Sequence, residues 1–311
     1  MELQTRIAID PTPQRLSHRD RLLLVGSCFT ENIGNRLEDY GFEVMSNPFG
    51  ILYNPISIAE CLRRCMDDIE ITSDELVHHN GLWHSWLHHG SFSHADKDTC
   101  LSQCNKHIHD AHAFMQQGCT IVLTFGTAYA YYLADKALPV ANCHKVPASQ
   151  FDKRLLTIET IADAYSNLLS HHLPTILTVS PIRHWADTPH GNQLSKGTLL
   201  LAIEQMRHNA LHACPDNTSF SYFPAYEIMM DELRDYRFYD ADMLHPSPLA
   251  VEIIWQRFVE TYMDSATCER GKKFQQLHKM EAHRPLFPES EEYKKHMERT
   301  EALRAQLTNE K

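Results

Sequence analysis

The sequence predicts an α/β fold built on a mainly parallel sheet. Short apolar runs alternate with stretches of helical periodicity over most of the 311 residues. The first run, Arg21–Cys28, is continuous and apolar, as in a strand covered on both faces. Strands that alternate with helices pair in parallel through right-handed crossovers, so these observations together indicate the class.

The remaining strands are expected at apolar runs bounded by polar or turn-forming residues. They are Phe42–Ser46, Cys119–Phe125, Thr175–Val179 and a weaker Ser219–Phe223. Helices are expected between and after the strands, with Thr30 or Asn32 capping the first of them. The others are Ser57–Asp68, Thr99–Gln117, Ile158–His171, Leu194–His212, a helix beyond Val251, and Ser290–Leu307.

These patterns divide the chain into one domain and an extension. The α/β domain is expected over residues 1–265, with an insertion at about 76–97 that is rich in histidine and tryptophan. Residues 266–311 are expected to form a charged helical extension, either a peripheral helix or a partner surface.

Composition excludes several classes of protein. With 43% hydrophobic and 22% charged residues, the chain is neither collagenous nor of low complexity. No apolar run approaches the ~20 residues of a membrane span. The net charge of −11 argues against general nucleic-acid binding, which needs clustered cations. The first residues lack a secretion signal and the nine cysteines form no CxxC pair, so reduced thiols and a cytoplasmic location are expected.

Ser27 is the first candidate for catalysis. It ends the first strand just before a helix, and ligands of open α/β sheets bind beyond the carboxyl ends of the strands. A helix start also presents free backbone N–H groups to a developing oxyanion. The G-x-S-x-G elbow of α/β-hydrolases is absent, because Val25 and Phe29 stand where it needs glycine. Taken alone, a small residue at such a turn is more often only a helix cap.

Asp242 and His245 form the second candidate, on a single loop. An acid three residues before a histidine can accept its Nδ1–H and leave Nε2 to take a proton from a serine. The order Ser, Asp, His, with the last two so close, favours a compact triad. Taken alone, the same residues also fit a surface turn followed by a helix cap at Ser247.

Two glycine-containing segments could line the same crevice. NPFGILYNP contains Gly50, whose backbone can approach a ligand closely because it has no Cβ. TFGTAYAY places Gly126 and Thr127 at the end of a later strand. Following strands of one parallel sheet, both segments would converge on Ser27.

Several long motifs follow one another between about Leu22 and Phe258. They read GSCF, NPFGILYNP, WHSW, NCHK, TVSPIRHW, FPAYEIMMDELRDYRFY and DMLHPS. In this order they resemble the GSCFA family, a group within the SGNH (GDSL-like) hydrolase superfamily. Thr30 stands where the naming motif has alanine. The resemblance implies the SGNH hydrolase fold, a flavodoxin-like three-layer α/β/α sandwich with a five-stranded sheet.

The resemblance also implies roles for the candidate residues. Ser27 would be the nucleophile, His245 the general base and Asp242 the acid that orients the imidazole. The N–H groups of Ser27 and Gly50 would form part of the oxyanion hole.

The third oxyanion donor of SGNH enzymes is missing from its usual place. In those enzymes it is an asparagine side chain in a Gly-x-Asn block, where this chain has Gly126, Thr127 and Ala128. Asn142 or His144 of NCHK could supply the donor from the next loop.

A metal site is one alternative for the histidine-rich segment. His84 and His88 are four residues apart, a spacing that could place both imidazoles on one helix face. No glutamate completes an HExxH motif, and His107, His109 and His112 fit a solvated helix face. The tryptophans of WHSW are instead expected to wall the pocket and offer aromatic faces to a sugar or acyl group.

Two further side chains near the triad have open roles. Cys28 adjoins Ser27 but points another way, so it is expected to be a buried small hydrophobe rather than a thiol nucleophile. Like His184, Arg183 follows the strand Thr175–Val179 on the side of the crevice. It could bind a substrate carboxylate or phosphate, or pair with the acidic run near Asp231–Asp235.

The sequence therefore predicts a serine-dependent ester hydrolase. Its expected substrate is an O-acetyl or short acyl ester of a carbohydrate, or a small-molecule ester, cleaved through an acyl-serine intermediate. No cofactor, metal, nucleic acid or membrane is expected to take part. The alternative is a degenerate SGNH-fold protein that binds a carbohydrate or protein partner without turnover, which the missing third donor favours.

Overall fold

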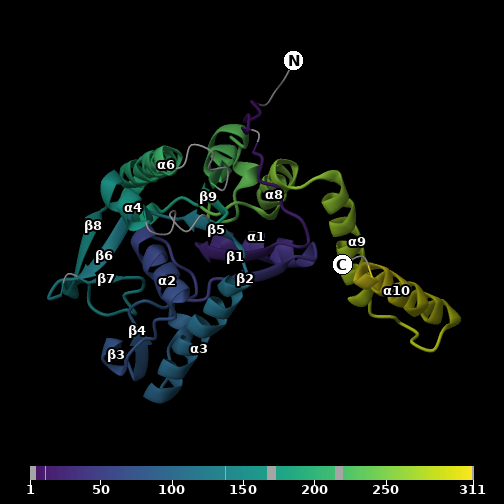
Figure 1. Cartoon of the computed structure of the whole chain (residues 1–311), viewed down its shortest axis with the longest axis horizontal. Coiled ribbons are helices and arrows are strands. Elements are labelled where there is room, and N and C mark those ends of the chain that lie inside the picture. The colour runs from purple at the N-terminus through teal and green to yellow at the C-terminus, as the bar shows by residue number, and fades with distance from the viewer. Residues whose placement is uncertain (1–4, 11, 137, 167–172, 214–219, 310–311) are drawn as a thin grey trace.

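The computed structural model describes residues 5–10, 12–136, 138–166, 173–213 and 220–309. Figure 1 shows helices packed around a central sheet, with the last two helices projecting to one side. In chain order the elements are β1 (Arg21–Gly26), α1 (Cys28–Asp39), β2 (Glu43–Ser46), α2 (Pro55–Asp67), β3 (Leu76–His79), β4 (Leu82–Ser85), α3 (Lys97–Gln116), β5 (Thr120–Phe125), β6 (Tyr129–Leu133), β7 (Pro139–Val140), β8 (Phe151–Leu155), α4 (Ile158–Ala164), β9 (Thr175–Val179), α6 (Thr188–Ala213), β10 (Phe220–Phe223), α7 (Ala225–Glu227), α8 (Pro248–Tyr262), α9 (Ser265–Glu281) and α10 (Glu291–Asn309).

The central sheet has five strands in the order β10-β9-β5-β1-β2, and every pairing is parallel. Numbered along the chain, this is the order 2-1-3-4-5 of flavodoxin-like sheets. The order reverses between β1 and β5, and such sheets bind ligands at that point, beyond the carboxyl ends of the strands. The predicted α/β class and five-stranded sheet are confirmed.

Two apolar cores separate the sheet from helices on its two faces. Along β1, Leu23 and Val25 belong to one core, while Leu22 and Leu24 belong to the other, because successive side chains of a strand point to opposite faces. The first core joins the sheet to α2, α3, α4 and α6, and the second joins it to α1 and α8. This gives the expected three layers, α/β/α.

The first helix begins earlier than predicted. Ser27, rather than Thr30 or Asn32, is its N-cap, because its backbone is extended and its hydroxyl accepts the Phe29 N–H at 3.3 Å. Thr30 is buried inside the first turn.

Two other predicted elements extend beyond the described residues. The predicted helix Ile158–His171 corresponds to α4, and its residues 167–171 lie outside the described part of the chain. Ser219, the first residue of the predicted last strand, also lies outside it.

Two small antiparallel sheets flank the main one. β3 and β4 form a hairpin inside the expected insertion, and β6 pairs with both β7 and β8. The second of these sheets was not predicted. Four of the five residues of β8 are exposed, and three of its side chains are charged, so this strand carries no apolar run.

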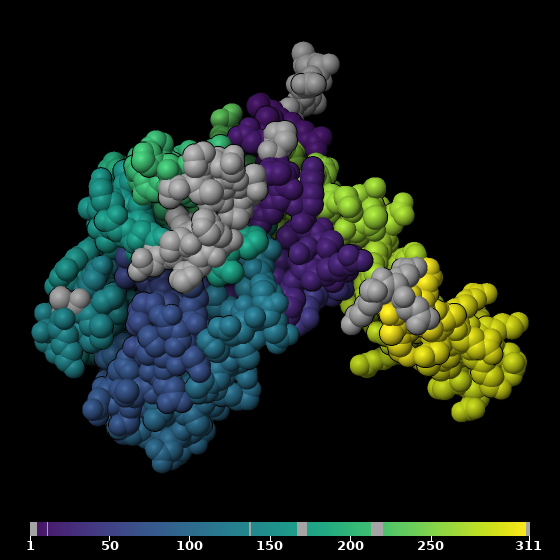
Figure 2. Space-filling model, in the orientation of Figure 1, coloured from purple at the N-terminus to yellow at the C-terminus, as the bar shows by residue number. Residues whose placement is uncertain are grey.

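The C-terminal helices α9 and α10 form a lobe at the edge of the body (Figure 2). α9 reaches the end of α1 through Gly271, where a Cβ would lie only 2.0 Å from the Tyr40 ring. Only a residue without a Cβ allows this close approach. The final helix was predicted with its own bounds, whereas α9 was expected only as part of a charged helical extension over residues 266–311.

The helices of the described residues are all too short or too polar to cross a membrane. The cysteines among these residues are all free thiols.

Candidate active site

Ser27 lies at the point where the sheet reverses its order, between β1 and α1. Its hydroxyl caps α1 and donates to Ser180 Oγ at 3.1 Å. Only 1% of the Ser27 surface is exposed. The candidate nucleophile is therefore a buried hydroxyl at the positive end of a helix dipole.

Asp242 and His245 form the predicted acid–imidazole pair. The His245 Nδ1–H donates to Asp242 Oδ2 at 2.5 Å. The other carboxylate oxygen accepts the N–H groups of His245 and Leu244, both at 2.9 Å. The N–H and ring of His245, together with the Leu244 N–H, lower the pKa of Asp242 to about 2. An ionised carboxylate in this position fixes the tautomer that leaves His245 Nε2 as a proton acceptor.

The loop that carries this pair is attached to the chain segment that follows β9. The Arg183 N–H donates to Leu244 O at 3.4 Å. The side chains of Asp242 and His245 are each 47% exposed. Within the described chain, no hydrogen bond joins Ser27 to His245, because the serine hydroxyl bonds to Ser180. The pair and the serine thus lie toward the same edge of the sheet without direct contact through a hydrogen bond.

A buried polar network lies behind Ser27. Ser180 follows β9 and is fully buried. Lys196 on α6 is 1% exposed, and its ammonium group donates to Gly126 O at 2.7 Å and to Ser180 O at 2.8 Å. Burial lowers the pKa of Lys196 to about 7. Lys196 therefore ties together the chain ends that follow β5 and β9, next to Ser27.

His184 and Tyr53 lie over the end of β5. Their rings meet edge to face, with 5.8 Å between centroids. His184 Nε2 is buried and has no hydrogen-bond partner among the described residues. It lies 3.3 Å from the position that a Cβ on Gly126 would take. Burial, followed by the charge of Lys196, lowers the pKa of His184 to about 4, so the imidazole is neutral at pH 7.

The glycine N–H groups near the crevice are engaged within the protein. The Gly50 N–H donates to a carbonyl of its own tight turn at 2.7 Å, and its φ is +76°. The close approach that Gly50 permits is to His89, whose Cβ would lie 2.4 Å from an added Cβ. The N–H groups of Gly126 and Thr127 both donate to Tyr53 O. In this arrangement none of the three is free to bind an oxyanion.

His144 contacts the β3–β4 hairpin, and Asn142 bonds to His144. His144 Nε2 bonds to Ser85 O at 2.8 Å, and its ring stacks on His84 with 4.4 Å between centroids. Asn142 Oδ1 accepts the His144 N–H at 2.9 Å. Within the described chain, neither side chain forms a hydrogen bond with a residue of the triad. The structure does not bring these two candidates to Ser27.

The structure does not favour a role for Thr127 in binding substrate or for Cys28 as a nucleophile. Thr127 Oγ1 bonds to Ser195 Oγ at 3.0 Å and is nearly buried, so it is not presented to the crevice. Burial raises the pKa of the Cys28 thiol, which disfavours a thiolate nucleophile.

Arg183 points its guanidinium group at an aromatic ring. The group lies 5.2 Å from the centroid of Trp185. Among the described residues Arg183 forms no ion pair, and two acids of the run considered as its partner, Asp231 and Asp235, pair with Arg234 and Arg237. Its position beside the Asp242–His245 loop leaves it available to a ligand.

The histidine-rich segment does not form the helix face considered for a metal. His84 lies on β4 and His88 on the loop after it, where its ring stacks on Phe49 with 4.0 Å between centroids. The described residues contain no group of three histidine, cysteine or acidic side chains that could hold a metal ion.

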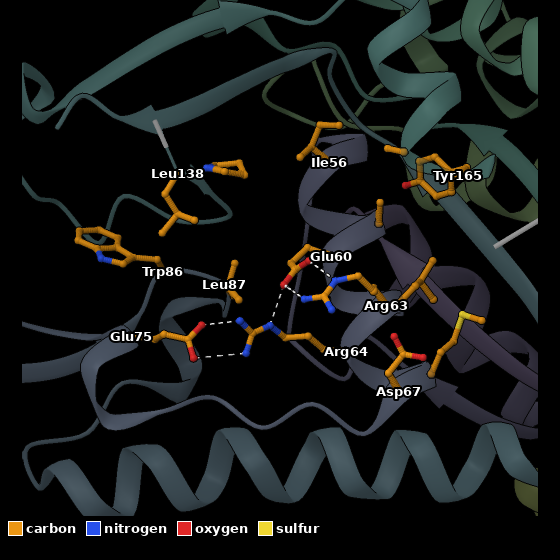
Figure 3. A pocket seen from close by; sticks show the side chains of 15 residues that line it. Ile56, Glu60, Arg63, Arg64, Asp67, Glu75, Trp86, Leu87, Leu138 and Tyr165 are labelled. Atoms are coloured by element: carbon orange, nitrogen blue, oxygen red, sulfur yellow. Dashed lines mark hydrogen bonds and ion pairs between the residues drawn. The ribbon is translucent and has the colours of Figure 1, made fainter. Parts of the chain in front are cut away.

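A groove separate from Ser27 runs along α2 (Figure 3). Its volume is about 600 Å³. Its apolar lining includes Ile56, Trp86, Leu138 and Tyr165. Trp86 of the WHSW motif, which was expected to wall the pocket of the catalytic serine, therefore lines this groove. None of the triad residues lines it.

Sequence reasoning missed the buried network behind Ser27. Sequence reasoning did place His184 after a strand on the side of the crevice but assigned it no role, and Ser180 of the same motif TVSPIRHW carried a similar positional signal. Lys196 gave no such signal, because a lysine in a helix is ordinarily read as a surface residue.

Comparison with known proteins identifies the family. No curated protein matches the chain. The model of the GSCFA family matches residues 21–258, a range that contains the central sheet, Ser27 and the Asp242–His245 loop. More than half of the chain is covered, so this protein belongs to the GSCFA family.

Proposed function

We propose that this protein is a serine-dependent ester hydrolase of SGNH type. The observation that carries the proposal is the bonded Asp242–His245 pair on a loop beside the end of β9, at the sheet edge where Ser27 caps α1. A protein that served only as a scaffold would have no need of a serine, an oriented imidazole and an ionised acid at one edge.

The proposed reaction proceeds through an acyl-serine. His245 Nε2 takes the proton of Ser27 as Oγ attacks the ester carbonyl carbon. The bond to the alcohol then breaks, and the alcohol leaves with the proton held by His245. Water next gives a proton to His245 and attacks the acyl carbon, and Ser27 leaves with that proton. One water is consumed, and one alcohol and one carboxylic acid are released.

The first step requires the Ser27 hydroxyl to change partners. It now donates to Ser180 Oγ, and in the reaction it would donate to His245 Nε2 instead. Catalytic hydrogen bonds are often long or absent before substrate binds, so this resting arrangement is compatible with the reaction.

We infer that the alcohol part of the ester is a carbohydrate and the acyl group is acetyl or similarly short. Tyr53 and Trp185 are 38% and 52% exposed and offer flat faces to a sugar ring. The chain has a net charge of −11, which favours an uncharged ester over an anionic one.

A binding protein without turnover is the second candidate. Ser27 is almost fully buried and bonds to Ser180, and the N–H groups of Gly50, Gly126 and Thr127 are already occupied. These contacts would suit a crevice that holds a sugar and performs no chemistry on it.

Acetate release from a panel of acetylated saccharides separates the two candidates. We expect the wild type to release acetate and Ser27→Ala to release none. Binding of the same saccharides is measured by calorimetry in parallel. Binding without release by the wild type would contradict the hydrolase and support the second candidate.

A further inference from the structure

We propose that His184 donates a hydrogen bond from Nε2 to the oxyanion that forms when Ser27 attacks an ester. This inference rests on the proposed hydrolase function. It assigns a catalytic role to a side chain outside the triad and outside the segment where SGNH enzymes carry their third donor.

The chain segment that follows β5 cannot supply that donor. Ala128 is fully buried within the apolar core, and its N–H donates to Ser195 Oγ at 2.7 Å. Thr127 Oγ1 bonds to the same Ser195 hydroxyl. Both groups are held in the interior, so a donor must come from another segment.

His184 holds a ring nitrogen in the required region. Gly126 follows β5, and in the sheet this strand lies between β1, which leads to Ser27, and β9, which leads to Ser180. His184 Nε2 lies 3.3 Å from where a Cβ on Gly126 would be. It therefore lies beside the chain segment that follows β5, the middle one of these three adjacent strands.

This nitrogen has no partner among the described residues. A buried polar atom without a hydrogen bond is destabilising, so such atoms in native proteins call for an explanation. A donor that is satisfied only when an oxyanion forms would stabilise the transition state more than the resting enzyme.

The charges around His184 keep its imidazole in the neutral form that this role needs. The charged or titratable groups that face it are Lys196 on α6, Asp187, Lys153 and His245. Burial and the cation of Lys196 lower the pKa, and Asp187 opposes them only in part, giving a value of about 4. At pH 7 the ring is neutral, and the tautomer protonated at Nε2 can donate without carrying a formal charge.

Lys196 also holds the two chain segments beside His184, those that follow β5 and β9, in place. Its ammonium group bonds to the carbonyls of Gly126 and Ser180, so the chain ends on either side cannot separate. In this role Lys196 is a positioning residue, because the described structure gives its ammonium group no contact with Ser27.

A pair of amide substitutions tests the proposal. In His184→Gln the amide nitrogen can take the place of Nε2, whereas in His184→Asn it reaches only as far as Nδ1. His184→Leu removes both nitrogens. The readout is the rate constant for labelling by a fluorophosphonate, whose phosphorus-bound oxygen takes the oxyanion position. Melting temperatures show whether each variant is folded.

We expect labelling to slow by about 100-fold or more in His184→Asn and His184→Leu. His184→Gln should stay within about tenfold of the wild type, because it keeps the donor. Equal rates in the wild type and all three variants would overturn the proposal. Equal slowing of all three, with lowered melting temperatures, would also overturn it in favour of a structural role.

The wild type separates this inference from the proposed function. If the wild type is not labelled at all, the hydrolase proposal fails and this one fails with it. If the wild type is labelled and the His184 variants match it, only the role of His184 is lost.

Discussion

The site at Ser27 and the groove along α2 are lined by side chains of opposite character, polar in the first and mostly apolar in the second. The crevice gathers hydroxyls, imidazoles and a buried lysine at the ends of β1, β5 and β9. The groove is mostly apolar, and Arg64 at its border is neutralised by Glu60 and Glu75. The groove is a well-formed cavity of about 600 Å³, yet none of its lining residues belongs to the triad. Topology, rather than cavity size, indicates where chemistry can occur in this fold.

The largest expected effect comes from removing the nucleophile in the crevice. Ser27→Ala should lower the hydrolysis rate of p-nitrophenyl acetate at least about 1,000-fold, because the variant loses the hydroxyl at the start of α1 that would attack the ester. Ser102→Ala, an exposed serine on α3, is the control and should match the wild type. Equal hydrolysis by Ser27→Ala and the wild type would move the chemistry out of the crevice.

The second effect tests the acid of the pair. Asp242→Asn should slow hydrolysis about 100-fold or more, because a neutral amide no longer fixes the His245 tautomer. The fold should persist, since the amide oxygen can still accept the N–H groups that Asp242 Oδ1 accepts now. Asp240→Asn on the same loop is the matched control. Similar rates for the two variants would contradict the pair's assigned role.

The third effect compares the hydrolysis rate after a side chain is enlarged at the Ser27 site with the rate after one is enlarged in the groove. Gly126→Ala places a methyl 3.1 Å from Tyr53 O and 3.3 Å from His184 Nε2, a tight fit in the crevice. We expect hydrolysis to fall about tenfold, since small displacements of catalytic groups are costly. Ala59→Leu fills part of the groove and should leave the rate within about twofold of the wild type. The reverse ranking would show that substrate occupies the groove.

The fourth effect concerns the buried lysine behind the crevice. Lys196→Met leaves the carbonyls of Gly126 and Ser180 without their donor and should cost about 2 kcal/mol in the free energy of unfolding. Lys136→Met, at an exposed position, should change it by less than about 0.5 kcal/mol. Urea denaturation measures both. A Lys196 variant as stable as the wild type would show that the ammonium group does not hold the strand ends together.

The smallest effect concerns the loop after the β3–β4 hairpin, which carries His88. Acid should reduce the stability that this loop contributes without affecting the site at Ser27. Burial lowers the pKa of His88 to about 3, so His88 stays neutral when folded but takes up a proton in the unfolded chain below pH 6.5. Its contribution to stability is therefore lost as pH falls through 6.5 toward 3, by about 2 kcal/mol between pH 7.5 and 5. His88→Leu should reduce the pH dependence of stability by that amount and leave labelling of Ser27 unchanged. Urea denaturation at pH 7.5 and pH 5 measures the free energy of unfolding of both proteins. An equal loss of stability in His88→Leu and the wild type would contradict this role of His88.

Much of the fold could be predicted because the central strands are continuous apolar runs. β1, β5 and β9 stand out in this way, and the Ser, Asp, His order marks two loops for chemistry. β8 could not be found, because its side chains are mostly exposed and only its pairing with β6 makes it a strand. The start of α1 was misjudged because several residues in a row can cap a helix.

The candidate site was predicted less completely than the fold. A sequence pattern places Gly50 near the end of a strand, but it does not show that the Gly50 N–H closes a turn. It also cannot show that His144 bonds to the hairpin, since that contact joins segments far apart in the chain. Lys196 and the unpartnered Nε2 of His184 emerge only once the strand ends are assembled in space.

The most direct test of the central claim is the intact mass of the protein after exposure to a fluorophosphonate, with the wild type beside Ser27→Ala. We predict one adduct on the wild type, mapped to the peptide that contains Ser27, and none on the variant. An adduct on both proteins, or on neither, would contradict the claim that Ser27 is an activated nucleophile.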